Sequence, residues 1–351
     1  MARSVQLRPA RFAGYRPSSR FGLPLLAACA IATVAIWLGA ETVLGGFTHP
    51  ASIEMQRASQ TMQAATQIIR TEKQRLGLMQ PLDIDPNRTG LIGSEYTEIT
   101  TSMGMLDAKR TATNPDLAAA IVRTIADMDP QPKGTAVVLV SGSILGADIA
   151  AIAGIESLGF TPLLISSVGA SMFGATDPDF TWLDIEALLL RSGVVKVRSS
   201  VAVIGGGGAT GGGLSPEGRD MIRASAARND IALLEEDSVD QLLERLEELI
   251  AEHGPVGVLI NAGGSVAALG TCIDGDLLPA GLISKPAPCT DGVPGLIVRM
   301  LDAGVPVLHL LNMRSLAAEW NLPYDPIPLP IPGNNKLIYG AGPSMPAAAN
   351  S

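Results

Sequence analysis

Short apolar runs rich in β-branched residues alternate with helix-like segments through the middle of this sequence, and this alternation limits the fold more than any other feature. The run at residues 135–140 (TAVVLV) has the character of a strand that is buried on both faces of a sheet. Helices are expected between such runs: one at residues 182–191, and another after Ser238, which forms a capping box with Gln241. The other expected strands are residues 161–166, 200–204, 256–260 and 305–310. The pattern predicts an α/β fold, a doubly wound and mostly parallel sheet with helices on both faces.

The N-terminal segment is expected to anchor the chain in a membrane. Residues 21–40 carry no charge, and about 20 such residues are enough for a helix to cross a bilayer core of about 30 Å. The basic residues before this run are Arg3, Arg8, Arg11, Arg16 and Arg20. Their position predicts a single-pass cell-membrane protein with a cytoplasmic N-terminus and an extracytoplasmic body. The alternative is a cleaved signal peptide, whose apolar core is usually shorter.

The rest of the chain is expected to form one domain. Residues 51–76 contain no Gly or Pro and predict a helix, either a stalk or a cover on the domain. Five prolines between residues 323 and 332 exclude a helix and a central strand there. The predicted parts are a basic N-terminus (1–20), a transmembrane anchor (21–44), a stalk helix (45–80), an α/β domain (81–322) and an extended tail (323–351).

Charge and cysteine content exclude some functions. The net charge of −9 argues against nucleic acid as a partner. No metal site is expected, because the three histidines are far apart and no C-x-x-C pair exists. Cys272 and Cys289 either pair in an oxidising compartment or remain free; two isolated cysteines form no disulfide framework, which favours free buried thiols.

The segments that follow the expected strands are rich in glycine and serine. In open α/β sheets, ligands bind beyond the carboxyl ends of the strands, at a switch in strand order. The candidate ligand-binding residues at these ends are Ser141, Ser143, Ser167, Gly263, Gly264 and Ser265. Hydroxyls and backbone N–H groups in such turns favour an anion such as a carboxylate or phosphate. The alternative is that small residues only permit tight turns.

A polar segment before the first strand supplies the remaining candidate ligand-binding residues, Glu95, Lys109 and Arg110. Lys109 and Arg110 are adjacent, and we expect this basic pair to face an anionic chain. The alternative is that both side chains are simply solvated.

A hydrolase is a second hypothesis, with Ser265 or Ser143 as the nucleophile. Residues 263–267 (GGSVA) come close to the G-x-S-x-G nucleophile elbow and join a strand to a helix. Asp302 and His309 follow in the chain order of a hydrolase triad, but His309 lies in an apolar strand, where a core histidine is the simpler interpretation. No cofactor is identified: Gly206, Gly208 and Gly211 match a dinucleotide pattern only within a long glycine run.

Several segments taken together resemble the poly-gamma-glutamate system protein family. They are residues 90–93 (GLIG), 106–111 (LDAKRT), 140–143 (VSGS), 165–171 (ISSVGAS), 177–184 (DPDFTWLD) and 214–219 (LSPEGR), with the Gly263-Gly264 loop. The resemblance extends from the anchor to about Leu322. The glycine run at residues 205–213 and the tail depart from the family pattern.

The resemblance implies a membrane-anchored accessory protein of poly-gamma-glutamate biosynthesis or export, a capsule-type polymer system. Its implied partners are the polymer chain and the poly-gamma-glutamate synthase components, and it assigns no catalytic residues. The alternatives are a hydrolase or transferase that acts on gamma-linked glutamate through a serine, and a non-catalytic scaffold.

Overall fold

The computed structural model describes residues 22–44, 48–129, 134–208 and 210–341. The chain divides into two compact units, Met1–Phe47 and Thr48–Ser351. The first contains helix α1 (Leu23–Leu44), which overlaps the predicted anchor, while the predicted basic N-terminus (1–20) lies outside the described residues. Within the described part of the chain, no helix meets the length and hydropathy needed to cross a membrane.

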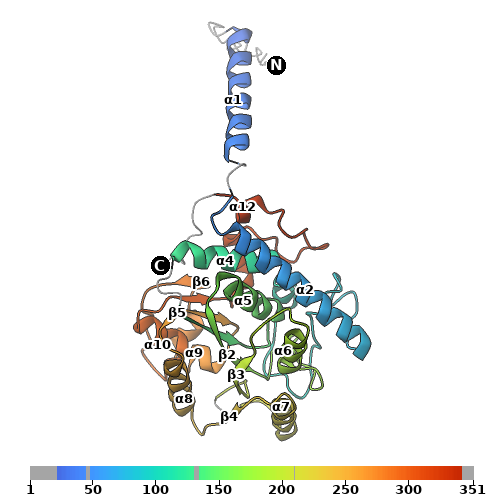
Figure 1. Cartoon of the computed structure of the whole chain (residues 1–351), viewed down its shortest axis with the longest axis vertical. Helices are drawn as coiled ribbons and strands as arrows, with labels where there is room; N and C mark the ends of the chain where they lie inside the picture. Colours follow the sequence, from blue (N-terminus) through green and yellow to red (C-terminus); the bar gives the residue numbers. More distant parts are fainter. Residues whose placement is uncertain (1–21, 45–47, 130–133, 209, 342–351) are drawn as a thin grey trace, which may run out of the picture. The chain divides into compact units, whose positions relative to one another are not determined.

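The second unit is built on a seven-stranded sheet in the order β4-β3-β2-β1-β5-β7-β6 (Figure 1). All neighbouring strands are parallel except β6 and β7, which are antiparallel. The strands are β1 (Thr135–Val140), β2 (Thr161–Ser167), β3 (Ser199–Val203), β4 (Leu233–Leu234), β5 (Val256–Ala262), β6 (Gly281–Ile283) and β7 (Val307–His309). The predicted α/β fold with a mostly parallel sheet is confirmed. Strands β4 and β6 were not predicted from the sequence, because segments of two and three residues are too short to show the alternation of apolar and polar residues that marks a strand.

Helices cover both faces of the sheet. They are α2 (Ser52–Leu76), α3 (Leu106–Thr111), α4 (Asp116–Met128), α5 (Leu145–Leu158), α6 (Trp182–Arg191), α7 (Pro216–Arg228), α8 (Val239–Glu252), α9 (Val266–Leu269), α10 (Leu296–Asp302), α11 (Met313–Glu319) and α12 (Lys336–Tyr339), with a 3-10 turn at Ile273–Leu277. Alternate residues of β1 belong to different cores: Val138 packs with α4, α5 and α6, whereas Val137 packs with α8 and α10. This two-sided burial explains why β1 has no polar face.

Helix α5 is enclosed on all sides. Every residue of α5 except Glu156 is buried, because the sheet lies beneath it and α2 and α4 lie over it. Its small residues permit this close packing: a Cβ on Gly146 would lie 2.0 Å from the carbonyl oxygen of Ala112. Helix α2 buries Met55 and Met62 in the same core, so it covers the domain rather than forming a separate stalk.

The segment after the proline-rich stretch folds back onto α2 and α4. Residues 323–332 contain no helix or strand, as the prolines predict, but the chain then forms α12, which is buried at Ile338 and Tyr339. The Tyr339 hydroxyl donates to Oδ1 of the buried Asp116 at 2.7 Å, and the same oxygen accepts from the Ser59 hydroxyl and the Gly333 N–H. The predicted extended tail therefore holds only for the proline stretch.

Tyr339→Phe should destabilise the domain, because it removes a buried hydrogen bond to a carboxylate. Such a bond contributes about 1.5–3 kcal/mol. We expect a fall of this size in the free energy of unfolding measured by urea denaturation. Tyr96→Phe is the control, since Tyr96 is 76% exposed. Equal stability of the two variants would contradict this role for Tyr339.

Candidate functional site

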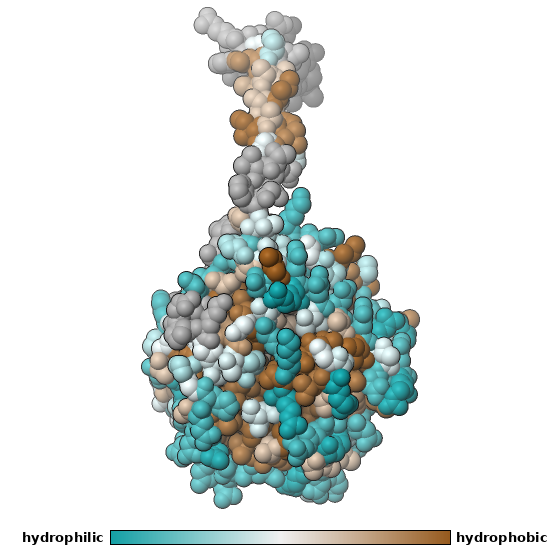
Figure 2. All heavy atoms as spheres, in the orientation of Figure 1, coloured by the Kyte–Doolittle hydropathy of each residue, from teal (hydrophilic) through white to brown (hydrophobic). Residues whose placement is uncertain are grey.

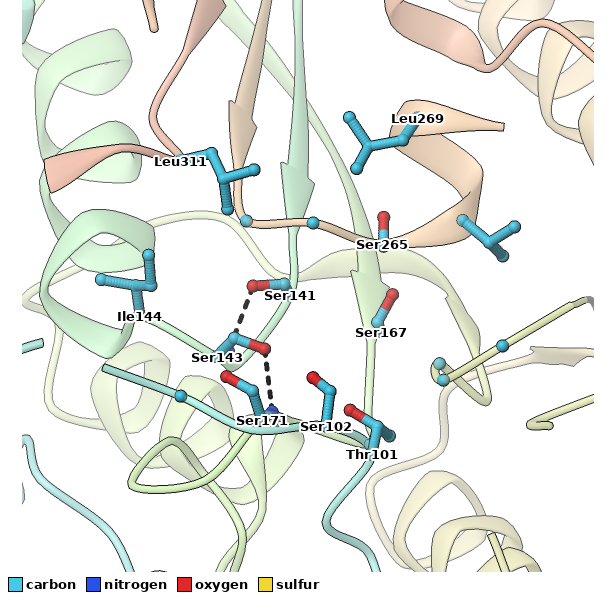
Figure 3. Close-up of a pocket in the computed structure, with 18 of the residues that line it drawn as sticks. Thr101, Ser102, Ser141, Ser143, Ile144, Ser167, Ser171, Ser265, Leu269 and Leu311 are labelled. Atoms are coloured by element: carbon cyan, nitrogen blue, oxygen red, sulfur yellow. Dashed lines mark hydrogen bonds between the residues drawn. The ribbon is translucent and has the colours of Figure 1, made fainter. Parts of the chain in front are cut away.

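A pocket of about 570 Å³ opens at the carboxyl ends of the strands, where the chain order reverses between β1 and β5. This is the switch point at which open α/β sheets bind ligands. Most of the hydroxyl side chains gather in the centre and lower part of the view, Leu269 and Leu311 lie above them, and Ile144 lies beside Ser143 (Figure 3). Lys109 is the only charged residue among the described residues that line the pocket, and no carboxylate lines it.

The turn after β1 is fixed by Ser141. Its hydroxyl donates to the carbonyl oxygen of Ala262 at the end of β5 (2.6 Å) and accepts from the N–H of Ser143 (3.1 Å). Gly263 is required beside it, because its φ is 139° and a Cβ there would lie 2.1 Å from Ser141 Oγ. The two central strands are therefore tied together at the floor of the pocket.

Asp148 supports the same turn from below. It lies in the first turn of α5, is fully buried, and accepts from the backbone N–H of Ser141 at 3.3 Å. Burial raises the pKa of the Asp148 carboxyl well above its ordinary value, which favours the protonated acid. This role could not be predicted from the sequence, since an acidic residue in a first helical turn is common.

Lys109 reaches the pocket from α3. It is 4% exposed; its Nζ contacts the carbonyl oxygen of Ser143 and lies 2.8 Å from the hydroxyl of Ser171. Burial lowers the pKa of Lys109 to about 7, and the carboxylate of Asp148 opposes this shift only in its ionised form. Near neutral pH the amine therefore exchanges between its charged and neutral forms.

The structure brings together seven of the nine predicted ligand-binding residues. Those that line the pocket are Lys109, Ser141, Ser143, Ser167, Gly263, Gly264 and Ser265. Ser265 also caps α9, where its hydroxyl accepts from the N–H of Ala268 at 3.3 Å. This convergence follows from topology, since the residues come from α3 and from the ends of β1, β2 and β5.

Glu95 and Arg110 lie outside the pocket. Glu95 is exposed in the loop before α3, and Arg110 forms an ion pair with Asp325 through two guanidinium nitrogens, one of them 2.7 Å from Oδ1. Successive helical residues point about 100° apart, so the side chains of Lys109 and Arg110 diverge. Arg110 therefore does not join Lys109 in the pocket, and contact of the two with an anionic chain stays a prediction.

His309 does not form a triad with Ser265. It is 1% exposed at the end of β7, and its Nδ1 lies 2.8 Å from Nδ2 of Asn261. Asp302 is exposed on α10, and neither residue lines the pocket. Burial lowers the pKa of His309 to about 4, which keeps the ring neutral. The core-histidine interpretation fits this arrangement.

Several lining residues are not among the nine predicted ligand-binding residues. They come from the loop before α3 (Thr101, Ser102, Met103, Gly104, Met105), from the turn after β2 (Gly169, Ser171) and from the glycine loop after β3 (Gly205, Gly206, Gly207, Gly208). Gly169 and the glycine loop do lie in segments that follow expected strands, so the sequence indicates them as part of a cleft at the strand ends. The loop before α3 could not be identified in this way, because only tertiary packing brings it over the sheet.

A disulfide closes the segment beside the pocket. Cys272 and Cys289 are bonded, with their Cα atoms 5.5 Å apart, and Cys272 follows Thr271 of the pocket lining. The expectation of free thiols is therefore wrong. The pair holds β6 and the preceding 3-10 turn, which are too short to be stable by themselves. The sequence separation of 17 residues does not by itself indicate whether the two Cα atoms come close enough for a disulfide.

Comparisons with known protein families, with characterised proteins and with solved structures find no match. Among the described residues, no three His, Cys, Asp or Glu side chains gather so as to hold a metal ion. Function must therefore be argued from the pocket and from the sequence.

The buried His309 makes stability dependent on pH. Its folded pKa of about 4 lies below the ordinary value of 6.5, so the unfolded chain binds the proton more tightly. The His309 contribution is fully present above pH 6.5 and is lost as the pH falls towards 4, by at most about 3 kcal/mol. We expect His309→Gln to reduce the slope of unfolding free energy against pH over this window, and His253→Gln, at an exposed site, to leave it unchanged. Parallel slopes for all three proteins would contradict a neutral buried His309.

Proposed function

We propose that this chain is a membrane-anchored accessory protein of poly-gamma-glutamate biosynthesis or export, and that its pocket binds the polymer. The observation that carries the proposal is the convergence of seven predicted ligand-binding residues in one open pocket at the strand-order switch. The resemblance of residues 90–219 and the Gly263-Gly264 loop to the poly-gamma-glutamate system protein family supplies the identity of the ligand.

The lining suits a chain of amides bearing carboxylates. Hydroxyls of Ser143, Ser167 and Ser265 can donate to carbonyl and carboxylate oxygens, and the absence of a carboxylate among the described lining residues avoids like-charge repulsion. The protonated form of Lys109 adds one positive charge. Because this lining is mostly neutral, we expect binding that depends only weakly on salt concentration.

Helix α1 supports the proposed attachment to a membrane. Its surface is mainly apolar (Figure 2), with Ile31, Ile36 and Trp37 each more than half exposed. The cytoplasmic N-terminus and extracytoplasmic body remain part of the proposal. The Cys272–Cys289 disulfide agrees with a body outside the cytoplasm, where disulfides persist. The poly-gamma-glutamate synthase components are the proposed protein partners.

Narrowing the pocket should weaken binding of short poly-gamma-glutamate to the full-length protein in detergent. Gly264 is exposed, and a Cβ there would make only ordinary contacts of 3.6 Å or more, so Gly264→Phe adds a ring with little strain. We expect Kd, measured by calorimetry, to rise by at least about tenfold, or 1.4 kcal/mol.

Ser192→Phe is the matched control, because it adds the same ring at the end of α6, away from the pocket. Equal affinity of the two variants, with unchanged melting temperatures, would show that the polymer binds elsewhere. Absence of binding to the unaltered protein would leave the synthase as the partner to test.

Charges in the apolar segment should release the protein from the membrane. Each arginine at the centre of a spanning helix costs about 2.5–3.5 kcal/mol on insertion scales. We therefore expect Ile31→Arg with Val34→Arg to move the protein from the carbonate-washed membrane pellet to the supernatant. Ile53→Arg, on the exposed face of α2, should remain in the pellet. Recovery of both variants in the pellet would contradict anchoring by α1.

A further inference from the structure

The contact between Lys109 and Ser171 is not required by the proposed binding role. Their Nζ and Oγ atoms are 2.8 Å apart, and both residues line the pocket. Lys109 is 4% exposed, whereas Ser171 is only partly buried, so a ligand in the pocket reaches the hydroxyl but not the shielded amine. Ser143 and Ser265, the serines favoured from the sequence, have no such contact with a side-chain amine among the described residues.

We propose that Ser171 is a nucleophile and Lys109 its general base, and that the pocket transfers acyl groups from amides or esters to water. This inference does not depend on the polymer being the natural ligand.

The contacts of Lys109 allow its amine to act as a base once it has lost a proton. A neutral amine has two N–H donors and one lone pair. In the structure Nζ of Lys109 donates to three oxygens: the carbonyl oxygens of Ser143 and of Ser171, the latter at 3.4 Å, and Oγ of Ser171 at 2.8 Å. On loss of one proton the two carbonyl oxygens keep the two remaining N–H donors, and the lone pair can accept the hydroxyl hydrogen of Ser171 across the same contact. Burial, which lowers the pKa of Lys109 to about 7, makes this form accessible at neutral pH.

Ser171 is held in place by backbone pairing on both sides. Thr101 N–H donates to the carbonyl of Ala170 at 2.8 Å, and Met172 N–H donates to the carbonyl of Ser102 at 2.9 Å. The turn that follows contains Phe173 at a φ of 64°, a conformation that costs energy for a bulky residue. A nucleophile on a rigid turn is positioned without loss of entropy during the reaction.

Ser143 lies where its hydroxyl can stabilise the reacting carbonyl group. Its Oγ accepts from the N–H of Ser171 at 3.0 Å (Figure 3), and no described residue accepts the hydrogen of its hydroxyl. That hydrogen can therefore be donated to the carbonyl oxygen of a bound substrate beside Ser171. Donors at this position stabilise the charge that develops as the nucleophile adds.

The reaction balances with water as the only co-reactant. Oγ of Ser171 bonds to the carbonyl carbon while its proton passes to Nζ of Lys109. The carbon–nitrogen or carbon–oxygen bond then breaks, and Lys109 returns the proton to the leaving amine or alcohol. Water attacks the resulting acyl-serine, again with Lys109 taking and returning one proton, which releases the acid and restores Ser171.

The first experiment maps the nucleophile on the unaltered full-length protein in detergent. A fluorophosphonate probe is added at pH 8, and the modified peptide is identified by mass spectrometry. We expect phosphonylation of Ser171, with loss of fluoride. Modification of Ser143 or Ser265 instead, or no modification, would overturn the assignment, and neither result depends on whether a variant folds.

The second experiment measures hydrolysis of p-nitrophenyl acetate. Ser171→Ala should fall to the rate of the uncatalysed reaction, and Lys109→Met should lose about 100-fold or more, the contribution of a general base. The rate of the unaltered protein should rise as the pH increases through about 7. Lys196→Met, at an exposed lysine before β3, is the control and should keep full activity. A Lys109→Met variant with the same rate and pH profile would exclude Lys109 as the base.

Poly-gamma-glutamate binding to Ser171→Ala separates this inference from the proposed function. Labelling of Ser171 without polymer binding supports the nucleophile and removes the polymer as ligand. Binding without labelling or hydrolysis keeps the proposed function and overturns the nucleophile.

Discussion

The contact between the ends of β1 and β5 determines the geometry of the whole site. Ser141 joins the two strands through its hydrogen bond to Ala262, and Gly263 leaves the space that this contact needs. From this point the chain continues into α5 on one face of the sheet and into α9 on the other, so the two turns separate and a pocket opens. A side chain at position 263 would push the strand ends apart and displace the serines on both turns.

The enclosed helix α5 also determines the position of Lys109. Because α5 is apolar on all sides, it requires the layer formed by α2 and α4. Gly146 lets the end of α3 approach the first turn of α5 at its backbone, which brings Lys109 over the turn at Ser143. The packing of the core therefore determines the geometry of the site, and loss of α2 would disturb both.

Elements that depend on local sequence pattern could be predicted, whereas contacts between segments distant in the sequence could not. The bounds of β1 and α6 agree with the expected residues 135–140 and 182–191, since both elements have a strong period and clear ends. Strand-end residues such as Ser141 were found because topology alone puts them together. The partner of Arg110 and the disulfide depend on contacts between segments with no local signal.

Lys109 differs from the cations that proteins use to hold anions. A cation for carboxylates is most effective when it stays charged and presents free donors, as an arginine does. The pocket instead buries a lysine whose nitrogen is already surrounded by oxygen atoms of Ser143 and Ser171, and burial works against its charge. The neighbouring Arg110, which would stay charged, is held outside by Asp325. The arrangement favours proton transfer at an uncharged group such as an amide over a role as a permanent positive charge.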